Sequence, residues 1–270
     1  MSDSPNMSFL DHLEVLRWHL IRSILVIVSL ALLAFVFHEF LFDTIIFGPL
    51  DPNFFTNRNL CLIAKSIDMP ALCINQKPIT LINISMSGQF TAHIMISLIS
   101  GLVFAFPYIL WEIWRFIEPA LLEIERKYAR RIISAGAFLF FTGVVFAYFI
   151  IIPFSSDFFG NYHVSSKILV DNMVSLESYV SMLASASLAC GLAFELPIII
   201  YFLSKIGLIT ASFLKKYRKH AIVVILIISA VITPPDVISQ IIVSLPLLVL
   251  YEISIVIAKR IQKAKELKNN

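Results

Sequence analysis

Long stretches without charged residues alternate along the chain with short charged segments. A helix needs about 20 mostly apolar residues to cross a hydrocarbon core of about 30 Å. Six stretches approach or exceed that length once their polar flanks are included, and one of them contains a single charge, Glu195. We expect the second span to end near Pro107. The predicted spans are approximately residues 20–39, 81–109, 131–152, 178–204, 219–234 and 237–257.

The last two predicted spans are short and are joined by the segment Thr233-Pro234-Pro235-Asp236. Tandem prolines interrupt a helix, so two thin spans are favoured over one long helix. Thr233 also stands three residues before Asp236, which is the spacing of a helix-start signal with proline at the first helical position. The chain is therefore predicted to be an all-α membrane protein with six transmembrane helices, in one polytopic domain of residues 1–270.

Lysine and arginine are distributed unevenly over the predicted loops. With the N-terminus in the cytoplasm, only Arg58, Lys65, Lys77 and Lys167 of the 21 basic residues fall in outside loops. Cytoplasmic loops of membrane proteins carry the excess of basic residues. Five or seven spans would place the basic C-terminal tail outside, so the pattern favours six spans with both termini in the cytoplasm.

Composition agrees with lipid as the main solvent of the chain. Hydrophobic residues make up 59% of the sequence and charged residues 14%, against about 25% charged residues in soluble domains. A net charge of +3 is too small to indicate a nucleic-acid partner.

The sequence contains no pattern typical of an enzyme or a metal site. P-loop, Gly-x-Gly-x-x-Gly, Gly-x-Ser-x-Gly and His-Glu-x-x-His motifs are absent, and the six histidines are scattered over different spans and loops. No catalytic activity, cofactor or metal is therefore predicted. Cys61 and Cys73 share one outside loop, and two alternatives stay open for them: a disulfide in an oxidising compartment, or two free thiols.

Two groups of carboxylates lie at positions where a negative charge suggests a function: one within a predicted span and one at the inner surface. Glu195 lies about 15 Å of helix from Lys205, near the middle of the membrane, where a charge costs about 2.5–3.5 kcal/mol on insertion scales. It is either a polar site inside a groove or a protonated acid hydrogen-bonded to a neighbouring helix. Acids at the inner surface, among them Glu14 and Glu112, either balance nearby basic residues or receive a cationic ligand.

A series of short motifs, in order along nearly the whole chain, resembles the TatC family, the polytopic receptor and core subunit of the twin-arginine protein translocase. The motifs are His12-Leu13-x-x-Leu16-Arg17, Gly48-Pro49-Leu50, Pro107-Tyr108-Ile109-Leu110, Trp114-Arg115-Phe116-Ile117-Glu118-Pro119-Ala120-Leu121, Glu125-Arg126, Gly143 to Phe149 with Pro153, Phe194-Glu195-x-Pro197, Thr233-Pro234-Pro235-Asp236-x-x-Ser239-Gln240 and Leu250-Tyr251-Glu252-Ile253.

The resemblance implies a concave bundle that recognises twin-arginine signal peptides at the cytoplasmic face and nucleates export of folded proteins, driven by the proton-motive force. Two arginines call for two nearby carboxylates, because each guanidinium fork binds a carboxylate in bidentate fashion. The signal-peptide site would hold Glu125, Glu14, Arg17, His12 and Glu123. The groove would carry Glu195, Asp236 and Gln240.

One position departs from the family pattern. The usual order is His-Leu-x-Glu-Leu-Arg, whereas here the acid is Glu14 and Val15 takes its place. On a helix this rotates the carboxylate by about 100°. Either Glu14 reaches the site from the inner surface, or Glu123 substitutes for it.

The resemblance also implies a location and partners. These are the cytoplasmic (inner) membrane and its lipid, single-span subunits of the TatA and TatB type, and further copies of the chain. An alternative from another class is a proton-coupled small-solute secondary transporter, which Glu195 motivates as a proton-linked site.

Overall fold

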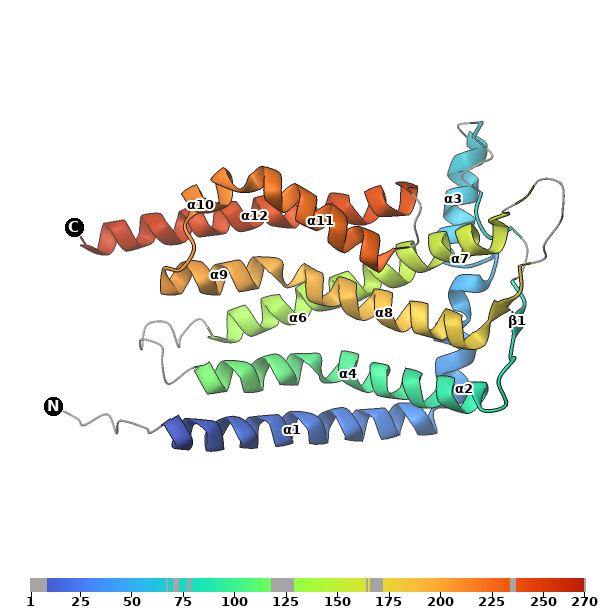
Figure 1. Ribbon diagram of the computed structural model, residues 1–270, viewed down its shortest axis with the longest axis horizontal. Coiled ribbons are helices and arrows are strands. Elements are labelled where there is room, and N and C mark those ends of the chain that lie inside the picture. Colours follow the sequence, from blue (N-terminus) through green and yellow to red (C-terminus); the bar gives the residue numbers. More distant parts are fainter. Residues whose placement is uncertain are drawn as a thin grey trace. The chain divides into compact units, whose positions relative to one another are not determined.

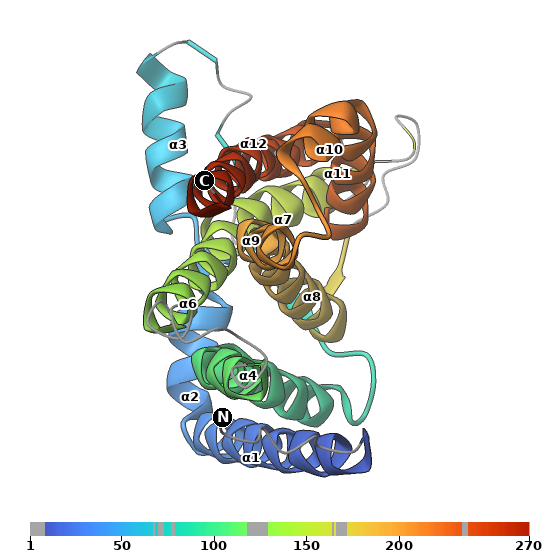
Figure 2. The ribbon, with the colours of Figure 1, turned by 90° about the vertical axis from the view of Figure 1, so that its left-hand side faces the viewer.

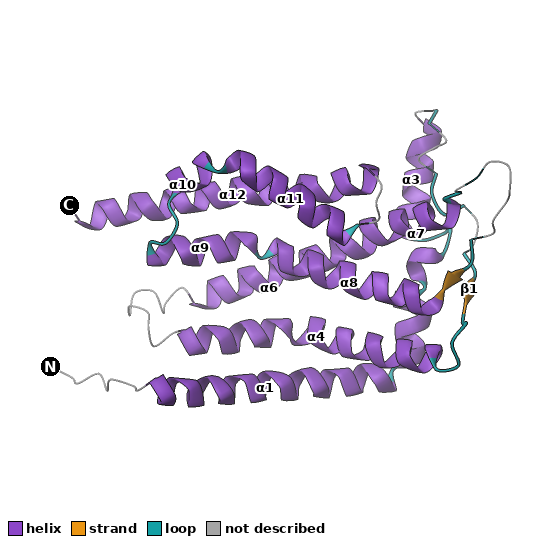
Figure 3. Cartoon of the chain, in the orientation of Figure 1, coloured by secondary structure: helices purple, strands orange, loops and turns teal. Residues whose placement is uncertain are grey.

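The computed structural model describes residues 9–66, 68–69, 73–76, 79–117, 129–163, 165, 172–233 and 237–269. The chain divides into two compact units, Met1–His38 with Ile94–Phe138, and Glu39–His93 with Leu139–Asn270. Each is considered by itself. Helices dominate the described residues, as Figure 3 shows, and the strands described are β1 (Leu81–Ile82) and β2 (Val174–Ser175), which pair in parallel.

The first unit is built around two long helices, α1 (Phe9–Val36) and α4 (Gly88–Ile117), the latter entering the unit at Ile94. The two helices lie side by side in Figure 1. Their backbones approach closely at Gly101, where an added Cβ atom would lie 2.6 Å from the backbone nitrogen of Ala31. Glycine is required here because any side chain would push the two helices apart.

The second unit contains the remaining elements. They are α2 (His38–Phe40), the π-helix η1 (Leu41–Ile46), the 3-10 helix η2 (Gly48–Leu50), α3 (Phe55–Ser66), the C-terminal part of α6 (Ala129–Phe146) from Leu139 on, the π-helix η5 (Ala147–Ile151), α7 (Ile152–Asn161), α8 (Leu176–Phe194), α9 (Leu196–Ile206), α10 (Ala211–Lys216), α11 (Arg218–Ile232) and α12 (Val237–Asn269). In Figures 1 and 2, α12 runs beside α9 and α11. Their shared core includes Ile200 of α9, Ile225 of α11, and Val243 and Leu247 of α12.

The described chain holds five helical segments long and apolar enough to cross a membrane, and many of their large apolar side chains are exposed. This confirms a helical, multi-pass membrane protein. The five are Leu13–Val36, Gly88–Ile117, Ile132–Asn161, Leu176–Ile206 and Ser239–Ala264. The predicted fifth span corresponds to α11, which has 15 residues. That length spans about 22 Å, so the six-span count stays a prediction.

The break between the last two helices is confirmed. Helix α11 ends at Ile232, Thr233 has an extended backbone, and α12 begins at Val237.

The second long helix does not end near Pro107, where the sequence predicts the end of the span, and the span's boundary in the membrane stays a prediction. Helix α4 begins at Gly88 and continues through Pro107 to Ile117, while Leu81 and Ile82 form a strand. A proline removes one backbone donor, and membrane helices tolerate this loss where neighbouring groups compensate for it.

Helix α6 packs closely against α8 at Gly143. A Cβ atom there would lie 2.6 Å from the carbonyl oxygen of Cys190 on α8. Elsewhere on α8, Ser181 and Ser185 are exposed.

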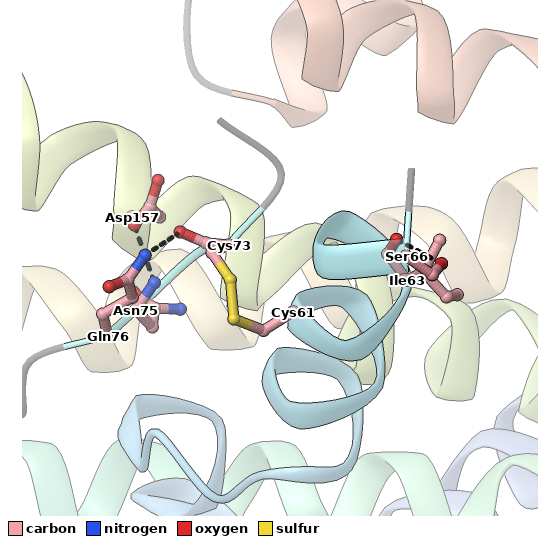
Figure 4. The surroundings of a disulfide bond; sticks show 7 residues. All are labelled: Cys61, Ile63, Ser66, Cys73, Asn75, Gln76 and Asp157. Atoms are coloured by element: carbon pink, nitrogen blue, oxygen red, sulfur yellow. Dashed lines mark hydrogen bonds between the residues drawn. A yellow bond between two sulfur atoms is a disulfide. The ribbon is translucent and has the colours of Figure 1, made fainter. Parts of the chain in front are cut away.

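A cap formed by α3 and the segment Cys73–Gln76 closes one end of the second unit. Of the two alternatives for Cys61 and Cys73, the structure contains the disulfide (Figure 4). The amide of Asn75 donates hydrogen bonds to the carbonyl oxygen of Pro153 at 2.9 Å and to Asn57 at 3.4 Å. The segment between α1 and α4 is thus partly helical.

Candidate functional site

The residues expected to bind a signal peptide begin at the start of α1. Glu14 and Arg17 lie there with exposed side chains. His12 belongs to the same helix, but its side chain lies outside the described residues. Glu123, Glu125 and Asp236 also lie outside the described residues, so their predicted roles stay predictions.

A buried polar cluster lies beside this end of α1 in the same unit. Nδ1 of His19 hydrogen-bonds to Oε2 of Glu112 on α4, and the hydroxyl of Tyr108 donates to Oε1 at 2.7 Å. Glu112 is 4% exposed. The carboxylate is therefore held on both oxygens, and this favours internal charge balance over ligand reception for Glu112.

This cluster was not predicted from the sequence. Tyr108 and Glu112 are four residues apart and share one face of α4, which is a signal the sequence carries. Their partner His19 comes from a helix 93 residues away in sequence, and no local pattern indicates that pairing.

The same contact fixes which way Glu14 faces. His19 marks the side of α1 that meets α4, and Glu14 lies five positions earlier on the helix, about 140° around its axis. Arg17 lies about 160° from His19. Glu14 and Arg17 therefore share the exposed side of α1, where an external peptide can reach both.

Glu195 stands at the break between α8 and α9 in the second unit. Its backbone carbonyl accepts hydrogen bonds from the amides of Ile198 and Ile199, each at 3.0 Å, and Pro197 follows in the first turn of α9. The side chain is 6% exposed, and no described residue hydrogen-bonds to Oε1. Because burying an unpaired polar atom costs free energy, the site favours a polar partner for Oε1 beyond those that the described residues supply.

Gln240 connects the two C-terminal helices. Its Nε2 atom donates to the carbonyl oxygen of Leu226 on α11 at 3.1 Å. Thr233, at the end of α11, is buried and donates its hydroxyl to the carbonyl oxygen of Ser229 at 2.8 Å. These contacts hold the junction on either side of residues 234–236.

A cavity of about 1080 Å³ opens in the second unit between α8, the end of α11 and the β1–β2 pair. Its lining is mostly apolar, but serine hydroxyls on one side of α8 and the hydroxyl of Thr233 add polar groups. The lining residues on α8 include Ser178, Tyr179, Ser181, Met182 and Ser185. Glu195 is not among its lining residues.

Among the described residues, no group of three or more His, Cys, Asp or Glu side chains is placed to hold a metal ion. The candidate functional groups among the described residues are therefore carboxylates and hydroxyls rather than metal ligands.

Comparisons with known proteins agree over nearly the whole chain. The family model for the Sec-independent protein translocase protein (TatC) matches residues 11–246. TatC of Blattabacterium sp. subsp. Periplaneta americana is 38% identical over 266 residues, which is 98% of this chain and 99% of that protein. TatCy of Bacillus subtilis is 32% identical over 253 residues, covering 94% and 89%.

A solved structure gives the same result. A crystal structure of the twin arginine translocase receptor TatC matches with a TM-score of 0.69 and 35% sequence identity, and the match covers 93% of this chain and 99% of that one. This agreement in sequence and fold confirms the resemblance drawn from the ordered motifs. The chain belongs to the TatC family of Sec-independent protein translocase proteins.

Proposed function

We propose that this chain is the core subunit of a twin-arginine translocase and that it captures twin-arginine signal peptides at the cytoplasmic face of the inner membrane. The observation that carries the proposal is the full-length match to a twin arginine translocase receptor, in a chain whose Glu14 and Arg17 are exposed together at the start of α1. Export of folded cargo is then driven by the proton-motive force, and the chain itself performs no catalysis.

Membership in a protein-translocase family overturns the alternative of a proton-coupled small-solute transporter. Glu195 motivated that alternative. In the present proposal Glu195 instead offers a buried carboxyl to a polar group of a partner helix, and Asp236 and Gln240 belong to the same groove.

The chemistry of capture rests on paired charges. A guanidinium presents a planar fork of donors that matches a carboxylate, whereas a lysine ammonium is a compact point charge without that geometry. We assign Glu125 as the first acid. The exposed position of Glu14 supports it as the second, and Glu123 is the substitute if Glu14 does not contribute. His12 and Arg17 help to position the N-terminal end of α1.

The proposed orientation follows the basic residues. Seventeen of the 21 lysines and arginines fall on the cytoplasmic side when both termini are cytoplasmic and all six helices span. The disulfide in the cap agrees with this orientation, because such bonds persist in oxidising compartments outside the cytoplasm.

Transport is proposed to require other subunits. A folded domain of 100 residues has a radius of gyration of about 13 Å, so its volume exceeds the 1080 Å³ cavity by on the order of tenfold. We therefore propose single-span TatA- and TatB-type subunits and further copies of this chain as partners. Reconstituted alone in liposomes, the chain should not move a folded cargo, and movement by the chain alone would contradict this part of the proposal.

Capture can be tested with the purified protein in lipid nanodiscs. A photoreactive signal peptide with paired arginines should crosslink to the chain, and the same peptide with paired lysines should crosslink weakly. Equal yields from the two peptides would contradict the proposal. A third peptide, with both arginines replaced by glutamine, measures the contribution of the apolar part of the leader.

A further inference from the structure

Helix α3 has one face that the cap holds and another that the described chain leaves uncovered. On the held face, Asn57 donates hydrogen bonds to the carbonyl oxygens of Pro49 and Asp51 at 3.1 and 2.8 Å. One turn later Cys61 forms the disulfide with Cys73 (Figure 4). Ala64, a further turn along, is fully buried. These positions recur every three to four residues and define the side of α3 that meets the segment Cys73–Gln76.

The opposite face is apolar and exposed. Phe55 is 63% exposed, Leu62 59% and Ile63 52%. Phe55 and Leu62 lie about 140–160° from Asn57 around the helix axis. Arg58 and Lys65 lie along one edge of this face, and the sequence of α3 contains no acidic residue. The face thus combines large apolar side chains with a basic edge.

Contacts around the start of α3 show its position along the length of the spans. Phe54, just before α3, stacks on Phe149 with ring centroids 5.3 Å apart. The hydroxyl of the adjacent Tyr148 donates to the carbonyl oxygen of Ile45 at 2.7 Å, and that of Tyr179 donates to the next carbonyl, Ile46, at 2.6 Å. Tyr179 lies in the first turn of α8. Helix α3 therefore starts level with the outer end of that span.

The held face of α3 points away from the bilayer. Asn75, on the segment that this face meets, hydrogen-bonds to Pro153 and Asp157. These residues lie four and eight positions beyond Phe149 on the continuous η5–α7 helix, about 6 and 12 Å farther out. The segment Cys73–Gln76 is therefore on the outer side of α3, and the opposite face looks back toward the hydrocarbon layer.

The direction of α3 agrees with this geometry. In Figures 1 and 2, α3 runs across α7, α8 and α12 of the same unit rather than along them. A helix in that direction at the end of the spans lies in the plane of the membrane surface. An amphipathic helix in this plane buries its apolar face about 5–10 Å into the boundary between headgroups and acyl chains.

We propose that α3 is an interfacial helix whose partner is the outer leaflet of the bilayer. Phe55, Leu62 and Ile63 enter the acyl boundary, while Arg58 and Lys65 reach lipid phosphates. Lipid is favoured over a second copy or a protein partner for two reasons. By the geometry above the face points toward the bilayer, and its basic edge complements phosphate. The inference rests on the proposed orientation but not on signal-peptide capture.

Photocrosslinking tests the proposal on the full chain in phospholipid nanodiscs. p-Benzoylphenylalanine is placed at Phe55, at Leu62 and, as the matched control, at Gln76, which is exposed on the outer segment of the cap. Positions 55 and 62 should give phospholipid adducts by mass spectrometry in severalfold higher yield than position 76. Formation of the Cys61–Cys73 disulfide in each variant shows that the cap has folded.

Three results would overturn the proposal. Equal lipid adducts at positions 55, 62 and 76 would show no preferred face. Adducts between two copies of the chain at positions 55 and 62 would make the face a protein interface. An absence of lipid adducts at both positions, with the disulfide formed, would place the face in water. None of these outcomes affects the twin-arginine and twin-lysine comparison, so the two proposals can fail separately.

Discussion

The cap and the start of α1 differ in how their functional surfaces are held. In the cap, the disulfide, the buried Asn57 and Asn75 and stacked aromatic rings fix α3 on one side. At the start of α1, His19 hydrogen-bonds to the buried Glu112 of α4, whereas Glu14 is exposed. The cap is therefore held by contacts within the chain, whereas the proposed receptor surface at the start of α1 keeps Glu14 exposed. The predictions below test this difference, starting with the largest effect.

Removing the buried histidine should destabilise the first unit most. His19→Ala leaves the 4%-exposed carboxylate of Glu112 without its imidazole partner, and breaking a buried pair from one side costs about 3 kcal/mol or more. Glu112→Gln should cost less, because an amide still bonds to Tyr108. Thermal unfolding in detergent measures both variants. Equal midpoints for the two variants and the parent would contradict a buried, paired contact.

Removing the disulfide should loosen the cap. The bond closes a loop of residues 61–73, and a bridge over a loop of this size is worth about 3 kcal/mol in the chain-entropy model. Cys61→Ser with Cys73→Ser should therefore speed hydrogen exchange of the α3 amides, while exchange in α1 stays unchanged. The parent protein under a reductant provides the matched comparison. Slow exchange of α3 in both samples would mean that the hydrogen bonds alone hold the cap.

Asn75 should show a backbone effect separate from its hydrogen bonds. Its φ of 48° lies in the left-handed region, which costs an L-residue with an ordinary side chain roughly 1–2 kcal/mol. Asn75→Ala and Asn75→Gly both lose the side-chain bonds, but only alanine suffers the strain. Alanine should therefore be less stable than glycine by about 1 kcal/mol in chemical unfolding of the cap. The reverse order would contradict the left-handed conformation.

Exposed charges should affect stability least. Arg218 and Glu252 form an ion pair of 2.8 Å with about half of each side chain exposed, and such pairs are worth less than about 1 kcal/mol. Glu14→Gln and Glu252→Gln should both unfold close to the parent temperature. They should differ in function, because only Glu14→Gln should weaken capture of a twin-arginine peptide. A large stability loss from Glu14→Gln would place that residue in a structural contact instead.

Much of the fold was predictable from the sequence because lipid imposes a simple pattern. Charge-free stretches located the long helices, and Pro234 and Pro235 correctly indicated two C-terminal helices. Pro107 misled the same analysis, since α4 continues through it where packing compensates for the missing donor. The sequence did not decide whether Cys61 and Cys73 are bonded, because spacing alone does not distinguish bonded from free cysteines.

The site was less predictable than the fold. The exposure of Glu14 agrees with its proposed role, but the His19–Glu112 contact joins two helices far apart in sequence and no local pattern indicates it. The apolar face of α3 was missed for a different reason. Phe55 and Leu62 stand among Asn, Arg and Lys, and only the position of the segment Cys73–Gln76 shows which way they face.

The central claim is that a carboxylate at the inner surface grips the paired arginines of a leader peptide. The most direct measurement is the affinity of a fluorescent twin-arginine peptide for the nanodisc-embedded chain and for its Glu125→Gln and Glu252→Gln variants. The account predicts a loss of roughly a hundredfold for Glu125→Gln, as for the removal of one partner of a charge-assisted pair worth about 3 kcal/mol, and no change for Glu252→Gln. Unchanged affinity in the Glu125→Gln variant would contradict the account.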